Sequence, residues 1–135
     1  PPEHAEAHRL AQEGDYAGAA DAYEQVLERE PDDELAKRGR AKALLLARSA
    51  NADVREAREK AAANPDDLDA QLAVADVDMI GGQIQDAFDR LLDYLAAHPD
   101  AVEPIRERML EYFLIPEATD ERLARARRRL ATLMY

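Results

Sequence analysis

The chain has 135 residues, a formal net charge of −11 and no cysteine, and 35% of its residues are charged. Without cysteine it has no disulfides, no thiolate nucleophile and no cysteine-based metal site. The negative charge argues against nucleic acid as the main partner, because binding to phosphates needs a basic surface. The longest apolar run, residues 43–47, is far shorter than the ~20 residues that cross a bilayer, so no membrane span is expected.

Alanine and leucine supply most of the apolar residues, whereas aromatic residues make up only 5% of the chain. Both are strong helix formers, and the β-branched and aromatic residues that favour strands are few. This composition is typical of packed helices, and it predicts an all-α domain.

Three prolines recur at a spacing of 34 residues, namely Pro31, Pro65 and Pro99, and an aspartate follows each of them. Proline ends a helix because it has no amide hydrogen and clashes with the preceding turn. The aspartate after it can cap the next helix or favour its positive N-terminus. The aspartates at these places are Asp32, Asp66 and Asp100. A period of 34 residues is typical of the helical hairpin called the tetratricopeptide repeat, or TPR.

The first and third repeats also share their turn and their second helix. A shift of 68 residues, two periods, takes Gly14 to Gly82 and Ala19 to Ala87. Glycine lets the chain turn between the two helices, and alanine admits a close helix crossing. The middle repeat is degenerate: Arg48 replaces the glycine, Asp53 replaces the alanine, and Lys60 stands at a usually apolar position. We expect a loosely packed hairpin there.

The pattern predicts about eight helices in a right-handed α-solenoid of TPR-like hairpins. Their expected ranges are 3–13, 17–29, 33–48, 53–63, 67–80, 84–97, 101–115 and 120–134. We expect one domain, with repeats over about 1–32, 33–66 and 67–100 and a capping hairpin over 101–135 that covers the last apolar face. Because the chain opens at Pro1 without a methionine, we expect it to be a fragment of a longer chain.

No group of residues in the sequence indicates catalysis, a cofactor or a metal. His4 and His8 lie four residues apart on one helix but lack a third ligand nearby, so we expect both to face solvent. The carboxylates are scattered and are expected to lie on solvated helix faces, and Ser49 is the only serine. A run of arginines near the C-terminus, residues 125–129, is expected to be a solvated face, with contact to an acidic partner or to a sister acidic surface as the alternative. We therefore predict a protein that is not an enzyme.

The first helix of each TPR hairpin lines the concave side of the stack, where extended peptides usually lie. Positions that repeat every 34 residues should form ladders across this groove. We predict an apolar strip of Leu45, Met79 and Phe113 with basic flanks that holds an unfolded, partly acidic client segment. The predicted groove residues are Arg38, Lys42, Leu45, Leu72, Met79, Arg106, Leu110 and Phe113. The alternative is that the apolar members complete the core.

From about Ala52 to Tyr135 the chain resembles one bacterial family, the thioredoxin-like co-chaperones called YbbN or chaperedoxins. The matching segments are residues 64–67 (NPDD), 69–73 (DAQLA), 87–92 (AFDRLL) and 127–131 (RRRLA). The resemblance implies a thioredoxin-like domain upstream of Pro1 and helical repeats that bind protein clients or chaperones. The absence of cysteine fits a reducing cytosol, so we expect a cytoplasmic protein. A TPR scaffold or assembly module in another bacterial complex is the alternative function.

Overall fold

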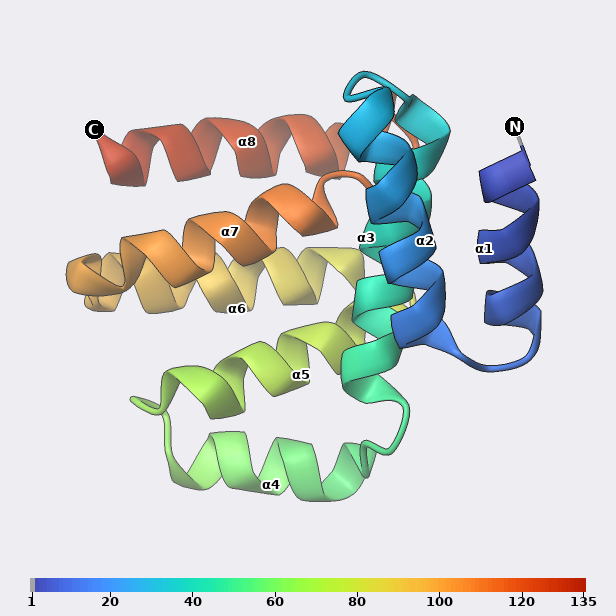
Figure 1. Cartoon of the computed structure of the whole chain (residues 1–135). Coiled ribbons are helices and arrows are strands. Elements are labelled where there is room, and N and C mark those ends of the chain that lie inside the picture. The colour runs from blue at the N-terminus through green and yellow to red at the C-terminus, as the bar shows by residue number, and fades with distance from the viewer. Residues whose placement is uncertain (1) are drawn as a thin grey trace. The chain divides into compact units, whose positions relative to one another are not determined.

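A computed structural model describes residues 2–135, and the side chains of residues 4–135. This part of the chain forms eight α-helices and one 3-10 turn, with no strand (Figure 1), which confirms the all-α prediction. The elements are α1 (Pro2–Gln12), α2 (Tyr16–Arg29), α3 (Glu34–Ser49), α4 (Val54–Ala63), α5 (Leu68–Ile80), α6 (Ile84–Ala97), η1 (Pro99–Ala101), α7 (Val102–Tyr112) and α8 (Glu121–Met134).

The chain divides into two compact units, Pro1–Ala50 and Asn51–Tyr135. The first unit holds α1, α2 and α3, and the second holds α4 to α8. The division falls between α3 and α4, inside the region expected to form the middle repeat.

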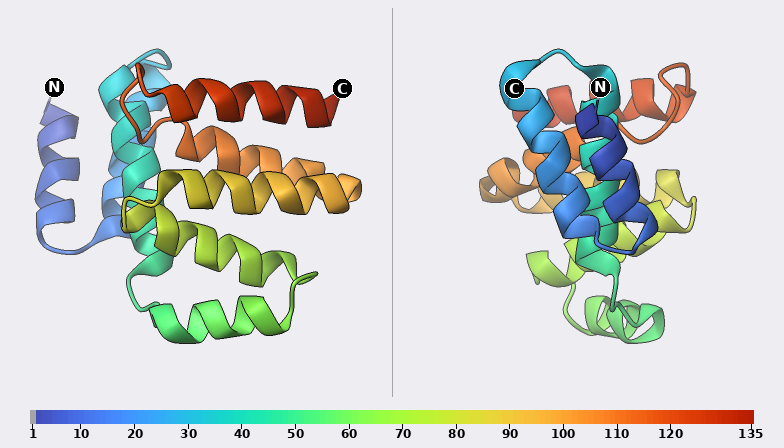
Figure 2. Two further views of the ribbon diagram at one scale, coloured as in Figure 1. Left: turned by 180° about the vertical axis from the view of Figure 1, so that it is seen from behind. Right: turned by 45° about the vertical axis from the view of Figure 1, so that its right-hand side comes forward.

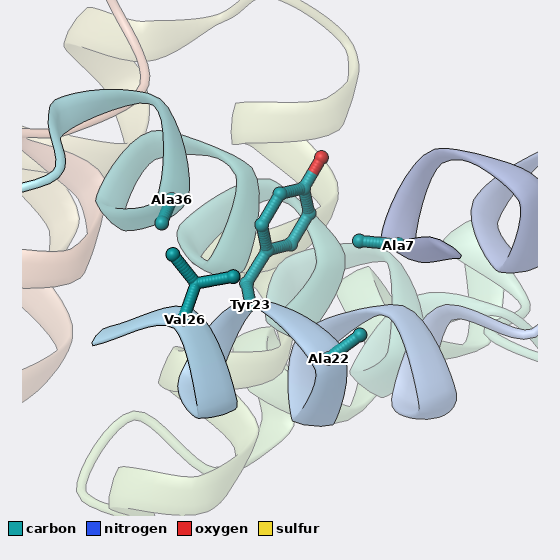
Figure 3. Packing of buried hydrophobic residues seen from close by; sticks show 5 residues of the cluster. All are labelled: Ala7, Ala22, Tyr23, Val26 and Ala36. Carbon is teal, nitrogen blue, oxygen red and sulfur yellow. The ribbon is translucent and has the colours of Figure 1, made fainter. Parts of the chain in front are cut away.

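In the first unit, α1 and α2 form a hairpin and α3 packs against α2. Gly14 turns the chain between α1 and α2 with a φ of 83°, a left-handed conformation that favours glycine. Tyr23 rises from α2 toward its neighbours, and its ring lies among small residues such as Ala7 of α1 and Ala36 of α3 (Figure 3). Ala19 is fully buried, as a close helix crossing requires.

In the second unit, α5 and α6 form the central hairpin, with α4 packed against α5 and both α7 and α8 packed against α6 (Figures 1 and 2). Gly82 makes the turn between α5 and α6 with a φ of 80°. The core is formed mainly by large side chains of α6, and its fully buried members there are Phe88, Leu91, Leu92 and Leu95. The last helix, α8, contributes Leu123, Ala126 and Leu130.

Helix capping differs from the expectation by one residue. The side chains of Asp33 and Asp67, not those of Asp32 and Asp66, accept the capping hydrogen bonds of α3 and α5. The proline and the first aspartate form the middle of a turn that a backbone hydrogen bond closes, for example from the N–H of Asp33 to the oxygen of Glu30. The second aspartate is therefore the first residue with the extended backbone that a cap needs.

After Pro99 the capping position is taken by Ala101, which has no polar side chain. Asp100 lies within the 3-10 turn and does not cap α7. Helix α7 also ends at Tyr112, three residues earlier than expected. Residues 114 and 115 instead hydrogen bond to the carbonyl groups three residues before them, which is a tighter turn than an α-helix. Pro116 follows, and a residue before proline disfavours the α conformation.

The middle repeat is displaced by one helical turn. Asp53 caps α4, just as Asp15 caps α2, so the alanine four residues after each cap is Ala57 in α4 and Ala19 in α2. On this alignment Ala61, the one buried residue of α4, takes the place of Tyr23. The longer α3, with 16 residues, delays the start of α4, and the shorter α4, with only 10 residues, offsets this delay. Asp53 is thus a cap and not a defect at an alanine position.

Candidate functional site

The predicted groove residues lie in both units. In the first unit Leu45 is buried, Arg38 is half-buried and Lys42 is exposed. In the second unit Leu72 and Met79 of α5 are buried, as is Phe113 after α7. Arg106 and Leu110 of α7 are exposed, Leu110 by 43%. The apolar side chains other than Leu110 therefore belong to the core, whereas the charged residues and Leu110 reach the surface to different degrees.

Phe113 lies within a small aromatic group of the second unit. Its ring meets the ring of Phe88 edge to face, with 5.7 Å between the centroids. The guanidinium of Arg127, from α8, lies 5.5 Å from the centroid of the Phe113 ring. One arginine of the C-terminal basic run therefore covers a core residue instead of only facing solvent.

The second unit contains a cavity of about 550 Å³ on α4, α5 and α6, within the size range of ordinary ligand sites. We call it the α4–α6 groove. Its lining residues are Arg58, Pro65, Asp66, Gln71, Asp78, Asp86, Asp89, Arg90, Asp93, Tyr94, Ala97 and His98. None of them belongs to the predicted strip.

Two buried polar side chains contribute to the groove from α5. Gln71 donates to the carbonyl oxygens of Ala61 and Asn64 at 3.0 and 3.2 Å, and it accepts from Arg90 Nη1 at 2.6 Å. The carboxylate of Asp78 accepts from Arg58 Nη2 at 2.7 Å. Buried polar groups are stable only when they are hydrogen bonded, so these bonds hold α4, α5 and α6 in one arrangement.

A row of carboxylates lies along α6. Asp86, Asp89 and Asp93 are spaced by three and four residues, which places them on one face of the helix, and all three are exposed. Asp93 accepts from Arg129 Nη2 of α8 at 2.7 Å, and Asp89 accepts from Gln85 Nε2 at 2.8 Å. Asp86 and Asp89 form no ion pair with any residue that the structure describes.

The groove also contains a stacked pair of rings. The Tyr94 and His98 rings lie 4.0 Å apart at an angle of 11°. His98 Nδ1 is 3.0 Å from the carbonyl oxygen of Tyr94, and Nε2 is 2.9 Å from a carboxylate oxygen of Asp66. These two contacts fix the orientation of the His98 ring within the groove.

The expectation that the carboxylates face solvent is wrong for two aspartates of α5. Asp76 and Asp78 are almost fully buried, although we expected scattered carboxylates on solvated faces. Asp76 accepts from the Tyr112 hydroxyl at 2.6 Å and from Arg108 Nη1 at 3.1 Å to each oxygen. The signal was present, because α5 has apolar residues on all sides, and such a helix is buried. Its polar residues must then have partners.

The histidines near the N-terminus are also placed differently from the expectation. His4 does not face solvent: its Nε2 lies 3.0 Å from Asp33 Oδ2, and its side chain is 13% exposed. His8 is exposed and lies edge-on to the Tyr23 ring. Among the described side chains, residues 4–135, no three histidine, aspartate or glutamate side chains form a group that could hold a metal ion. No helix in this range is long and apolar enough to cross a bilayer.

A family model described as tetratricopeptide repeat matches residues 47–135, about two thirds of the chain. Relatives include an uncharacterized protein of Mycobacterium tuberculosis and one of Mycobacterium bovis, each 29% identical over 132 residues. These alignments cover 97% of this chain but only 43% of each relative. No solved structure matches the chain significantly. With its 34-residue period, its helical hairpins and this match, the chain belongs to the tetratricopeptide repeat family.

Proposed function

We propose that the chain is the client- or chaperone-binding part of a thioredoxin-like co-chaperone in the bacterial cytoplasm. The TPR fold generally serves as a scaffold for protein binding and not for catalysis. The matched region, residues 47–135, nearly coincides with the region that resembles the YbbN family. The mycobacterial relatives are more than twice as long as their matched part, which leaves length for a thioredoxin-like domain of the kind that we propose upstream of Pro1.

The observation that carries the binding proposal is the α4–α6 groove. Binding sites need groups that are held in place before the partner arrives. Here hydrogen-bonded side chains such as Gln71 and Asp78 fix the helices, and the exposed carboxylates of α6 remain available at the surface. We infer that a segment of a partner protein lies in this groove.

We propose a second contact surface on the first helix of each hairpin, where the sequence predicted the groove. It consists only of the predicted residues whose side chains reach solvent. In the second unit these are Arg106 and Leu110, which lie four residues apart on one face of α7. In the first unit Lys42 is exposed and Arg38 is half-buried on α3. An exposed leucine beside an arginine can contact an apolar or acidic partner residue.

Client binding is tested by diluting a denatured model protein into buffer with and without the 135-residue chain, and by following aggregation through light scattering. We expect the chain to suppress aggregation at near-stoichiometric amounts. A chain that is folded by circular dichroism but has no effect in large molar excess would contradict client binding and favour the assembly-module alternative.

The contribution of the α7 surface is tested with Leu110→Asp. Because Leu110 is already exposed, this variant should fold normally and suppress aggregation less well than the parent if α7 contacts the client. Leu35→Asp is the matched control, since Leu35 is 70% exposed on α3 and is not among the proposed contact residues. Equal suppression of aggregation by the two variants and the parent would show that α7 does not contact the client.

Met79→Asp, in contrast, should unfold the second unit because Met79 is buried.

The co-chaperone proposal has a separate test. The coding sequence immediately upstream of Pro1 should encode a thioredoxin-like domain, and the full-length protein should then be assayed for disulfide reduction. An unrelated upstream domain would contradict the co-chaperone assignment, while the protein-binding proposal would be decided by the aggregation assay alone.

A further inference from the structure

We propose that the α4–α6 groove binds an extended protein segment rich in lysine or arginine. This inference rests on the proposed protein-binding function and adds the chemistry of the partner. It differs from the sequence-based expectation of an acidic client on the first-helix face, because the groove is formed by other residues and has the opposite preference for charge.

The first support is the balance of charge. Five aspartates line the groove, against two arginines and one histidine. Asp78 and Asp66 are occupied by Arg58 and His98 within the groove. The carboxylates of Asp86 and Asp89 remain exposed. A hollow lined mainly by one sign of charge concentrates the electric field and attracts the opposite charge.

The second support is that the chain's own guanidinium groups already bind two other carboxylates of the groove, Asp78 and Asp93. Arg58 contacts Asp78 at 2.7 Å, and Arg129, which is not a lining residue, contacts Asp93 at the same distance. Both contacts have the short geometry of a charge-assisted hydrogen bond. The Arg129–Asp93 pair is exposed, and such pairs contribute little stability, so a partner's arginine could replace Arg129.

The third support is spacing. Asp86 and Asp93 are seven residues apart, which corresponds to about 10 Å along α6. Alternate side chains of an extended segment point the same way and are separated by about 7 Å. Two alternate basic side chains can therefore reach carboxylates along this row. Tyr94 lines the same groove, and an aromatic ring beside carboxylates also attracts a cation.

The test measures binding of a fluorescein-labelled peptide of alternating lysine and serine to the 135-residue chain by fluorescence anisotropy. A peptide of alternating glutamate and serine is the comparison, and it should not bind. For the double variant Asp86→Asn, Asp89→Asn we expect about tenfold weaker binding of the basic peptide at low ionic strength, with a smaller loss at high salt.

The matched control is the double variant Glu103→Gln, Glu107→Gln, which removes the same charge from exposed positions of α7. It should change binding by less than about twofold, since these residues do not line the groove. Equal losses in the two double variants would overturn the inference, because the peptide would then respond only to the net charge of −11.

Removal of the Arg129 side chain should increase the affinity of the chain for the basic peptide. Arg129→Ala releases the carboxylate of Asp93 and should tighten peptide binding by about two- to fivefold. Arg128→Ala is the control, because it removes the same charge from the adjacent, exposed position of α8. Equal effects of the two variants would contradict a role for Asp93 in the groove.

The outcomes also separate this inference from the proposed function. If the chain suppresses client aggregation but does not bind the basic peptide, the inference is wrong and the proposed function stands. If it does neither while folded, both are wrong. If the peptide binds and Asp86→Asn, Asp89→Asn loses both peptide binding and suppression of aggregation, the groove is the client site.

Discussion

The hydroxyl of Tyr112 is fully buried and donates its hydrogen bond to the carboxylate of Asp76, which Arg108 also binds. This group joins α5 to α7 through polar atoms in the core of the second unit. A buried carboxylate is stable only while its partners remain in place. The removal of one donor should therefore have a measurable cost.

Tyr112→Phe removes this donor while keeping the ring. We expect it to lower the free energy of unfolding by about 1–3 kcal/mol, because the Asp76 carboxylate loses a hydrogen bond inside the core. Urea unfolding followed by circular dichroism measures the change. Tyr135→Phe is the control, since Tyr135 is 98% exposed and should show no difference. A Tyr112→Phe protein as stable as the parent would mean that the bond contributes nothing.

Because of the same tyrosine, we expect the free energy of unfolding to depend on pH in the alkaline range. Burial, and then the neighbouring charge of Asp76, raises the pKa of Tyr112 well above its ordinary value near 10. The folded state therefore keeps this proton when the unfolded state loses it. The contribution of the protonated Tyr112 to the free energy of unfolding is fully present below about pH 10. Above pH 10 the free energy of unfolding should fall by up to about 1.4 kcal/mol per pH unit.

Unfolding experiments in urea at a series of alkaline pH values should show this slope, and Tyr112→Phe should flatten it. Some slope should remain in the variant, because burial also raises the pKa of Tyr23. An unchanged slope in Tyr112→Phe would show that other groups control the alkaline transition.

Replacing Gly39 by alanine should lower stability, although the same change in most helices raises it. In a helix interior, replacing glycine by alanine usually stabilises by about 0.5–1 kcal/mol. At Gly39 of α3 the added Cβ would overlap the ring of Tyr23, which is buried. We expect Gly39→Ala to destabilise by about 1–3 kcal/mol in thermal or urea unfolding. Gly81→Ala, where the Cβ meets only ordinary contacts, should be nearly neutral.

At the scale of the elements, α2 shows how a small residue sets a helix crossing. Ala19 is fully buried and clusters with Ala20 and with Ala43 of α3. Ala19→Leu should overpack this crossing and lower stability by about 1–3 kcal/mol. Ala17→Leu, on the exposed side of the same helix, is the control and should change the melting temperature little. Equal melting temperatures of the two variants would show that the crossing tolerates a larger residue.

Helix α4 shows the limit of repeat alignment. A constant 34-residue spacing makes Asp53 and Lys60 look like errors, yet Asp53 caps the helix and Ala57 and Ala61 face the interior. The caps Asp15 and Asp53 are 38 residues apart, and the next cap position, Gln83, comes 30 residues later. A helix can gain or lose one turn without changing which face is buried, so the period is preserved only on average.

At the scale of the whole molecule, the division between the units has a consequence for proteolysis. Residues 50–53 are all exposed, and α4 buries only Ala61. Proteases prefer exposed connections of this kind. In limited digestion with trypsin we expect the first cut after Arg48, giving fragments 1–48 and 49–135 by mass spectrometry. An earlier cut after Arg90, the one tryptic site within α6, would contradict the proposed weak point.

Charge is distributed unevenly over the chain, and the structure uses part of this asymmetry. The first 100 residues carry a net charge of −12, and the last 35 carry +1. Arg129 binds an aspartate of α6, and Arg127 covers Phe113, so the basic run contributes contacts within the second unit. The basic segment is visible in the amino-acid sequence, but which of its arginines have partners inside the molecule depends on how α8 packs.

The helical class, the repeat period and most helix ends, to within one or two residues, follow from the amino-acid sequence. These features depend on local chemistry: proline cannot continue a helix, glycine accepts the positive φ of Gly14 and Gly82, and aspartate caps. The packed helices were needed to identify the partners of the buried Asp76 and Asp78 and the displacement of α4 by a turn. Helix packing also brings Arg58, Gln71 and residues of α6 together in one groove, which the amino-acid sequence did not predict. A carboxylate has the same local backbone preferences on a solvated face and in a core. The partners that make its burial possible come from other helices, and packing alone brings them together.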